Sequence, residues 1–273
     1  MNQSTPHSLA ACEPTKYPHP ERSRYLAAGW PLWDGCRPVR PLCVGDVHVF
    51  AVHLRLDDAL VNARRALLSP DERERAARRR IAAKAGEFIL TRAALRRVIG
   101  SYLDVPPEQV RFELGEHGKP SLSPEHGRAL TFNVTHSHEW ALIAVAFNLA
   151  LGVDVEKMRP KVDYVRLARR FFSPHERGQL DALPGEDRQH AFFHCWARKE
   201  AVIKGNGRGI ALGLDNFDVT LGPHEPPRLL TTRWAPAEAE NWQLFELQVA
   251  PRYAGALAVR APRIRVHQAC IAT

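Results

Sequence analysis

The chain has 273 residues, of which 45% are hydrophobic and 25% charged, as in an ordinary globular protein of one long or two short domains. No apolar run is long enough to cross a bilayer, and the N-terminus lacks the basic stretch and apolar core of a secretory signal, so we expect a cytoplasmic protein without a membrane span. The net charge of +8 suits a nucleic acid, an acidic protein or a polyphosphate ligand, and it does not choose among these partners.

The character of the chain changes near residue 46. Residues 1–45 are rich in proline and show neither helical nor strand periodicity, which predicts an irregular N-terminal extension. From Val47 the apolar residues alternate, which predicts a strand over 47–54. Further strand patterns occur, in chain order, at 110–114, 131–134, 140–147, 151–156, 216–221, 242–249 and 254–260.

Two predicted helix starts share the pattern Ser-Pro-x-Glu. In residues 69–72 the serine can cap the helix, the proline fits its first turn and the glutamate completes a capping box, and residues 173–176 repeat the pattern. The order of strand, then helices, then strands therefore occurs once in each half of the chain. This order predicts an α+β fold of two similar halves, 46–148 and 149–273. Helical stretches are expected at about 70–82, 84–100 and 187–204.

The five cysteines are scattered along the chain, and no two of them are spaced as C-x-x-C. This distribution argues against both a disulfide framework and a structural zinc site. We therefore expect reduced thiols in a reducing compartment.

Residues 151–156, with the sequence Leu-Gly-Val-Asp-Val-Glu, place two carboxylates on one face of a predicted strand. Alternate side chains share a face, so Asp154 and Glu156 point one way while Val153 and Val155 point into the core. Two carboxylates at this spacing can hold a hard cation through oxygen and leave positions for water or phosphate. The alternative is a half-buried strand with an ordinary polar outer face.

A second pair of charges lies on the helix predicted over 187–204. Glu200 and Lys204 are four residues apart and share a helix face, which by itself is typical of an exposed ion pair contributing about 0.3–0.5 kcal/mol. The rest of this helix is largely apolar, however. A charged pair on a mostly buried helix needs a partner such as a metal ion or a phosphate.

Residues 132–138 combine short polar side chains with histidines at a predicted strand end, which indicates a phosphate cradle. Zinc is the alternative for His136 and His138, but further ligands at the usual spacing are lacking. The glycine-rich residues 205–209 follow a helix rather than a strand, so they indicate a helix-ending turn and not a dinucleotide fingerprint. The arginine-rich run at 73–80 suits a solvated helix face, a phosphate or an acidic partner.

Taken in order, these segments resemble the phosphopantetheinyl transferases of the surfactin-synthetase-activating (Sfp) type. The family patterns G-K-P, F-N-[IV]-[ST]-H-S, G-[IV]-D-[IV]-E, F-F-[ST]-x-x-E and W-x-x-K-E-[AS]-x-x-K correspond, respectively, to residues 118–120, 132–137, 152–156, 171–176 and 196–204. The resemblance spans about residues 47–220. It implies the family fold, a pseudo-duplicated α+β structure of two similar halves with the active site and coenzyme A between them.

The resemblance also implies roles for individual residues. Asp154, Glu156 and Glu200 would hold Mg²⁺, and Lys204 would contact the phosphates of coenzyme A. The residues that would line the nucleotide and its 3′-phosphate are Lys119, Asn133, Thr135 and His136, with Asp154 beside them.

This sequence departs from the family pattern in places. Thr135 stands where serine is more frequent, which keeps the hydroxyl. The family's upstream basic residues for the 3′-phosphate do not align cleanly, and Arg75 and Lys84 are the candidates here. Val155 lies between the two metal carboxylates, so water is expected at a ligand position that some relatives fill with a side chain.

The implied reaction is attack by a serine of an apo acyl or peptidyl carrier protein on the β-phosphate of coenzyme A, releasing adenosine 3′,5′-bisphosphate. Mg²⁺ would neutralise charge on the pyrophosphate, Lys204 would stabilise the departing phosphate and Glu200 would be the general base. Carriers of this kind are acidic helical bundles, which suits the basic surface. A chain that holds both halves is expected to act as a monomer.

Two other functions are weighed against this one. An Mg²⁺-dependent nuclease would use Asp154, Glu156 and Lys157 on a basic protein, but it leaves His136 and the helix at 196–204 unexplained. A basic nucleic-acid-binding protein would have aromatic residues among the arginines of 73–80, and that run has none. We therefore expect no nucleic-acid partner.

Overall fold

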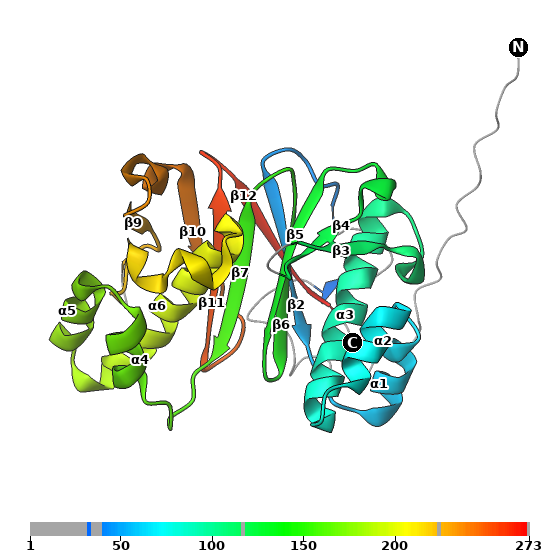
Figure 1. Cartoon of the computed structure of the whole chain (residues 1–273), viewed down its shortest axis with the longest axis horizontal. Coiled ribbons are helices and arrows are strands. Elements are labelled where there is room, and N and C mark those ends of the chain that lie inside the picture. The colour runs from blue at the N-terminus through cyan, green and yellow to red at the C-terminus, as the bar shows by residue number, and fades with distance from the viewer. Residues whose placement is uncertain (1–31, 34–39, 116–117, 223–224, 272–273) are drawn as a thin grey trace, which may run out of the picture.

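Two long helices, and the sheets that they cover, organise the molecule. The computed structural model describes residues 32–33, 40–115, 118–222 and 225–271. Helix α3 (Ala82–Leu103) covers a five-stranded sheet, and α6 (Gly185–Asn206) covers a three-stranded sheet (Figure 1). The two sheets face each other between these helices, and the chain thus builds an α+β fold of two halves, as the sequence predicts.

The strands are shared between the two halves as follows. The five-stranded sheet has the order β1 (Leu32–Trp33), β12 (Arg265–Ile271), β2 (Asp46–His53), β6 (Trp140–Phe147) and β5 (Leu130–Ser137). The three-stranded sheet has the order β10 (Trp242–Glu246), β11 (Tyr253–Arg260) and β7 (Leu151–Lys157). Two small hairpins pair β3 (Phe112–Leu114) with β4 (Pro120–Leu122), and β8 (Phe217–Val219) with β9 (Leu229–Thr232).

The remaining helices are short and lie outside the sheets. They are α1 (Asp58–Arg65), α2 (Pro70–Ala77), α4 (Tyr164–Phe171) and α5 (Pro174–Ala182). None of the helices among the described residues combines the length and apolar character needed to cross a membrane.

Alternation along the strands separates the apolar cores. In β2, Val47 and Val49 belong to the core between the sheets, whereas Phe50 and Val52 pack on the helix side. A strand buried on both faces reads as a nearly continuous apolar run, which is why β2 and β6 are recognisable in the sequence. The packing of both sheets against each other holds the two halves together.

The two Ser-Pro-x-Glu segments fold alike and tie each half together in the same way. Each forms a complete capping box at the start of its helix, α2 or α5. Each capping glutamate also pairs with a basic residue of the long helix of its own half. The pairs are Glu72 with Arg96 at 2.6 Å and Glu176 with Lys199 at 2.6 Å, all four side chains being buried. The same combination of capping box and buried ion pair in both halves supports the prediction that the two halves are similar.

The structure adds elements that the sequence patterns do not reveal. Helices α1 and α4 are missing from the predicted elements, and α1 buries no residue that would mark an apolar face. Strand β12 is also missing, because its residues 265–271 mix charged and apolar side chains. It leaves the C-terminal half and pairs in parallel with β2, so the last strand lies in the sheet of the first half (Figure 1). The predicted domain bounds therefore stay a prediction.

The expected irregular course of residues 1–45 is wrong for one short piece. Leu32–Trp33 form β1, which pairs in parallel with β12. Trp33 is 2% exposed and packs in the core beneath α3, and burial of a large ring is what holds this piece on the sheet. Residues 1–31 and 34–39 lie outside the described residues.

Helix α6 lies directly on the backbone of β7, and glycine makes this approach possible. A Cβ added to Gly152 would lie 2.1 Å from the carbonyl oxygen of Ala201 and 2.3 Å from the amide nitrogen of Gly205. Both are backbone atoms, so neither can give way without moving the helix. We therefore expect Gly152→Ala to lower the free energy of unfolding by about 1–3 kcal/mol or more, measured by urea titration, and to lower activity as well.

A matched glycine provides the control for that measurement. Gly178 is exposed in α5, and an added Cβ there would meet no atom of the described residues within 4 Å. Gly178→Ala should be neutral or stabilise by about 0.5–1 kcal/mol. Equal stability of the two variants would contradict the close backbone contact of α6 with β7.

Candidate active site

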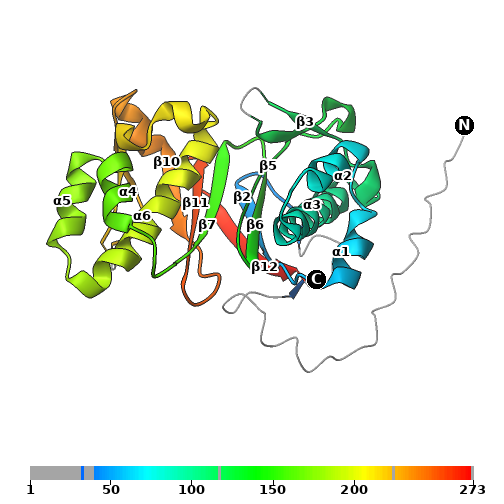
Figure 2. The ribbon, with the colours of Figure 1, turned by 60° about the horizontal axis from the view of Figure 1, so that its bottom comes forward.

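Three alternate side chains of β5 reach the edge of β7, where the two halves meet. Asn133 Oδ1 accepts a hydrogen bond from the backbone N–H of Val153 at 2.8 Å, and Ser137 Oγ accepts one from the N–H of Lys157 at 3.1 Å. Strands β5 and β7 run side by side in both views (Figures 1 and 2). Because side chains alternate along a strand, Thr135 between them faces the same edge.

Thr135 and Lys204 meet at the carboxylate of Asp154. Thr135 Oγ1 donates to Asp154 Oδ1 at 3.1 Å, and Lys204 Nζ of α6 lies 2.5 Å from the same oxygen and 3.1 Å from Thr135 Oγ1. Burial disfavours the ammonium of Lys204, but the Asp154 carboxylate outweighs it and raises the pKa of Lys204. The structure thus brings together three predicted site residues from β5, β7 and α6.

Asp154 is the centre of a crowded acidic group. It is 2% exposed, and its second oxygen, Oδ2, is buried without a hydrogen-bond partner among the described residues. Burial, and then the charge of Asp154, raise the pKa of Glu156 to about 7, and the same two causes raise the pKa of Glu200. Buried carboxylates that repel one another are stabilised by a cation, which is the expected setting for a metal ion.

These carboxylates fit Mg²⁺ as a donor set. All the donors are oxygens, the ligand type that Mg²⁺ prefers, and Asp154 Oδ2 is a buried acceptor that lacks a protein donor. Asp154, Glu156 and Glu200 are not closely grouped. Among the described residues, the set whose three ligand atoms lie within 4.8 Å of one another is a different one. Convergence of Asp154, Glu156 and Glu200 on one ion therefore remains a prediction.

The raised pKa of Glu156 predicts a pH-dependent stability of the metal-free protein. Its pKa in the fold is about 7 against 4.5 for the unperturbed group, so the neutral form favours the fold. That stabilisation is complete below about pH 4.5 and is lost as the pH rises through about 7. Glu156→Gln has a side chain that is neutral at every pH. Its free energy of unfolding should exceed that of the parent by about 1–3 kcal/mol at pH 8 in EDTA.

Urea titrations at several pH values measure this difference. It should shrink as the pH falls and approach zero below about pH 4.5, where Glu156 of the parent protein is neutral in both the folded and the unfolded state. A difference that does not change between pH 5 and pH 8 would show that Glu156 ionises at its ordinary pKa.

A group of basic side chains lies on the other side of β5, against α3. His136 Nε2 is 3.7 Å from a carboxylate oxygen of Glu87, and Lys84 Nζ lies 2.8 Å from the same oxygen. Burial, with the nearby positive charges of Lys84 and Arg79, lowers the pKa of His136 despite Glu87. Two predicted phosphate ligands, His136 and Lys84, are thus neighbours, and Arg79 is a neighbour that the sequence patterns do not single out.

Arg75 and Lys119 lie at different places around this centre. The guanidinium of Arg75 is 5.8 Å from the centre of the Phe88 ring on α3, and the side chain is exposed. Lys119 Nζ donates to the carbonyl oxygen of Lys204 at 2.6 Å. Lys119 also lines a cavity of about 580 Å³, together with Phe132, Gly207 and Arg208. This cavity adjoins the site through the backbone of Lys204.

The turn after α6 forms the rim of this cavity. Gly207 has φ 82°, in the left-handed region, and ends α6 as the sequence predicts. The glycine-rich segment is therefore a helix-ending turn beside the cavity rather than a dinucleotide fingerprint.

A buried ion pair of Lys199 and Glu176 lies next to Glu200 and is not evident from the sequence alone. Both side chains are 0% exposed, and Lys199 Nζ also donates to the carbonyl oxygen of Phe217 at 2.7 Å. Glu176 additionally accepts from the backbone N–H of Val219 at 2.9 Å. These contacts fix the middle of α6, next to Glu200, against the rest of its half. The sequence predicts Glu176 as a capping residue, and its pairing with Lys199 is not predicted, since a charged residue is normally expected to be exposed.

The fold and this site define a class of protein, and the comparisons agree on it. A family model described as the 4′-phosphopantetheinyl transferase superfamily matches residues 150–258, and one described as 4′-phosphopantetheinyl transferase, N-terminal, matches residues 58–148. The chain belongs to the 4′-phosphopantetheinyl transferases of the Sfp type, a family of enzymes. The two family models together reach residue 258, which lies beyond residue 220, where the resemblance of the sequence motifs ends.

Similar proteins cover most of the chain. The 4′-phosphopantetheinyl transferase HetI of Nostoc sp. is 38% identical over 83% of this chain and 93% of its own length. The 4′-phosphopantetheinyl transferase psf-1 of Bacillus pumilus is 33% identical over 80% of this chain and 92% of its own length. Sfp of Bacillus subtilis is 33% identical over 57% of this chain and 67% of its own length. Nothing in these comparisons supports the nuclease alternative.

Proposed function

We propose that this enzyme transfers the 4′-phosphopantetheine moiety of coenzyme A to a serine of an apo acyl or peptidyl carrier protein, in an Mg²⁺-dependent reaction. The observation that carries the proposal is the buried contact of Asp154 with Lys204 and Thr135, beside two carboxylates of raised pKa, at the junction of the halves. Transfer from a pyrophosphate needs both kinds of group, since a cation would neutralise charge on the phosphates and a base would take the proton of the attacking hydroxyl.

Asp154, Glu156 and Glu200 would hold the metal ion. When bound, Mg²⁺ would neutralise negative charge on the pyrophosphate of coenzyme A as the bond to the leaving group breaks. The orphaned Oδ2 of Asp154 supports this assignment, because it offers an acceptor that the protein leaves without a donor.

Glu200 is assigned as the general base and Lys204 as the cation for the leaving group. The serine oxygen forms a bond to the β-phosphorus while the bond to the bridging oxygen breaks, and adenosine 3′,5′-bisphosphate departs with that oxygen. Glu200 takes the hydroxyl proton, as a carboxylate whose pKa burial and Asp154 raise in the metal-free protein. Lys204, held charged by Asp154, offsets the charge that develops on the departing phosphate.

The basic residues around the centre are assigned to coenzyme A. His136 and Lys84 lie side by side against Glu87. Lys84 and Arg75 offer positive charge for the 3′-phosphate, and His136 offers a ring nitrogen as a hydrogen-bonding group. Lys119 lines the cavity next to α6, which suits the nucleotide. Thr135 contributes its hydroxyl, whereas the side chain of Asn133 holds β7 and would act on the nucleotide by fixing that strand.

The carrier protein, the oligomeric state and the location belong to the same proposal. The net charge of +8 and the exposed arginines of residues 73–80 suit an acidic carrier, since complementary charge speeds encounter. Both halves of the site come from one chain, which suits a monomer. Cys43 and Cys195 are free thiols, which suits the reducing cytoplasm.

The test is a transfer assay with purified components. The full chain is incubated with coenzyme A, Mg²⁺ and an apo carrier protein, and the mass of the carrier is measured by mass spectrometry. We expect a gain of one phosphopantetheine per carrier, abolished by EDTA and by changing the acceptor serine to alanine. A carrier of unchanged mass across acyl and peptidyl carriers would overturn the proposal.

A further inference from the structure

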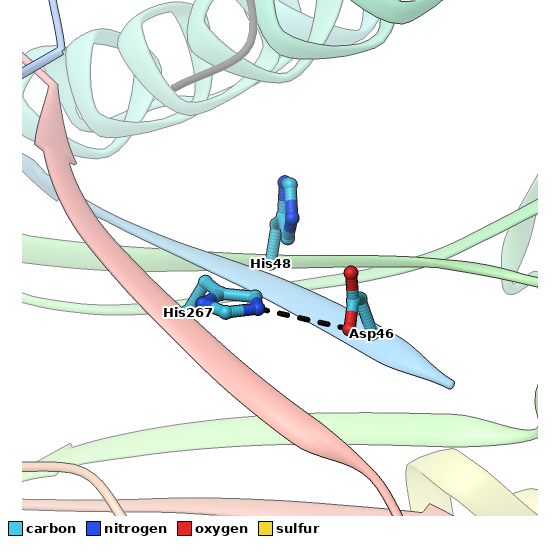
Figure 3. Close-up of side chains that lie close together, drawn as sticks. All are labelled: Asp46, His48 and His267. Atoms are coloured by element: carbon cyan, nitrogen blue, oxygen red, sulfur yellow. Dashed lines mark ion pairs between the residues drawn. The ribbon is translucent and has the colours of Figure 1, made fainter. Parts of the chain in front are cut away.

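A cluster of metal-ligand side chains lies away from the transferase site, on the helix side of the five-stranded sheet. Asp46 and His48 come from β2, and His267 comes from β12 (Figure 3). Strand pairing places His267 directly beside His48, and Asp46 two residues along on the same face. One ligand atom from each side chain lies within 4.8 Å of the other two.

His48 carries a buried nitrogen that the protein does not use. The side chain is 2% exposed, and its Nδ1 lies 2.6 Å from the hydroxyl of Tyr102 on α3. Its Nε2 is buried without a hydrogen-bond partner among the described residues. Buried polar atoms almost always have a partner, so the unpartnered ring nitrogen of His48 calls for one.

The other two side chains complete a set that is open to solvent on one side. Asp46 is 4% exposed, and its Oδ1 lies 3.7 Å from His267 Nε2. The His267 side chain is 26% exposed, which leaves a path to the cluster. In Figure 3 the His267 ring reaches towards Asp46, and the His48 ring extends away from these two side chains, towards the helix above the sheet.

Two arginines compete for the same groups. Arg265 Nε lies 2.7 Å from Asp46 Oδ1, and an Arg40 guanidinium nitrogen lies 3.4 Å from His267 Nδ1. The Arg265 side chain is 68% exposed, so it can turn into solvent without burying a charge. Arg40 approaches the ring nitrogen that faces away from Asp46, and it leaves Nε2 for a ligand role.

We propose that Asp46, His48 and His267 form a second metal site, for a borderline divalent transition-metal ion such as Zn²⁺. Two imidazoles and one carboxylate are a zinc-type donor set, whereas Mg²⁺ and Ca²⁺ prefer oxygen alone. The hydroxyl of Tyr102 on His48 Nδ1 is the outer contact that fixes the orientation of a ligating ring. The fourth position is left to water.

The geometry needs only a small contraction. Ligands about 2.0–2.1 Å from a tetrahedral ion lie about 3.3–3.4 Å apart. The ligand atoms of the cluster now lie within 4.8 Å of one another. They would reach the shorter separation if the partly exposed His267 ring moved inwards.

The ion would join the last strand, β12, to β2. Strand β12 comes from the C-terminal half, and residues 265–271 add to the sheet beside β2. A cross-link between His267 and the pair Asp46 and His48 would hold β12 in register. This second site is independent of the proposed transfer reaction, and its tests do not use activity.

Zinc binding is tested on the full chain after treatment with chelator and dialysis. Isothermal titration with Zn²⁺ is carried out in excess Mg²⁺, so that the oxygen-only carboxylates of the transferase site are occupied. We expect one Zn²⁺ per chain and at least a tenfold loss of affinity in His267→Ala. The control is His190→Ala, because His190 and His194 stack on α6 with ring centres 4.6 Å apart and form the rival histidine pair. Loss of binding in His190→Ala with retention in His267→Ala would overturn the proposal.

Two further measurements do not depend on how well the alanine variant folds. Co²⁺ added to the parent protein in excess Mg²⁺ should give the intense visible absorption of a four-coordinate nitrogen-containing site. Zn²⁺ should raise the Tm of the parent and not that of Asp46→Asn. A weak six-coordinate Co²⁺ spectrum, or no stoichiometric Zn²⁺ binding to the parent, would refute a site at these residues.

Discussion

Glu200→Gln is expected to lower the rate of phosphopantetheine transfer by about 10²–10⁴-fold while the protein keeps its fold. The amide matches the shape of the carboxylate but cannot accept the serine proton. Burial and Asp154 raise the pKa of Glu200, so the parent side chain is a stronger base than an ordinary glutamate. Single-turnover transfer to an apo carrier, followed by mass spectrometry, measures the loss, and the Tm checks the fold.

The matched control for this variant lies on the same helix. Glu186 is exposed in the first turn of α6, so Glu186→Gln makes the same charge change far from Asp154. Its rate should stay within about twofold of the parent rate. Because Glu200 is assigned to the metal as well, the rate of Glu200→Gln is also measured at increasing Mg²⁺. Recovery of the rate at high Mg²⁺ would assign Glu200 to metal binding, and near-normal turnover at ordinary Mg²⁺ would remove it from both roles.

Asp154→Asn is expected to have the largest effect, a loss of transfer of at least about 10³-fold. Asp154 holds Lys204 at 2.5 Å and Thr135 at 3.1 Å, and its Oδ2 is the buried acceptor assigned to Mg²⁺. Loss of metal binding and loss of Lys204 positioning each remove several kcal/mol of transition-state stabilisation, and about 1.4 kcal/mol is tenfold in rate. The measurement is the transfer rate across an Mg²⁺ titration.

A second readout separates this role from a merely structural one. The charge of Asp154 contributes to the raised pKa of Glu156, so the variant should lower that pKa. Carbon-13 NMR of labelled glutamate would follow it directly. Asp181→Asn, at an exposed position of α5, is the control and should match the parent in both measurements. If Asp154→Asn keeps the activity of the parent at the same Mg²⁺ concentration, the proposed role of Asp154 is wrong.

Several features of the site were predictable because they depend on short stretches of chain. The period-two pattern of residues 151–156 predicts that Val153 and Val155 enter the core, and both lie in the core between the sheets. The capping boxes at residues 69–72 and 173–176 form as predicted, since a cap needs only its own four residues. The glycine turn after α6 is local in the same sense.

Other features depended on contacts that no local pattern contains. Asn133 is predicted to line the nucleotide, whereas its side chain carries a backbone hydrogen bond of β7, twenty residues away. Lys199 reads as one more charge on a helix, yet it is buried against Glu176. Strand β12 completes the sheet of the other half, which only the packing of the whole chain decides.

The sequence by itself determined the family, the α+β class and which residue types carry the chemistry, because periodicity, caps and motifs each depend on residues close together in the chain. The tertiary structure alone decided that Lys204 reaches Asp154 across 50 positions and Thr135 across 69. The physical reason is the contact of α6 with the backbone of β7 at Gly152, where the absence of a side chain lets the helix approach and bring its lysine to the strand.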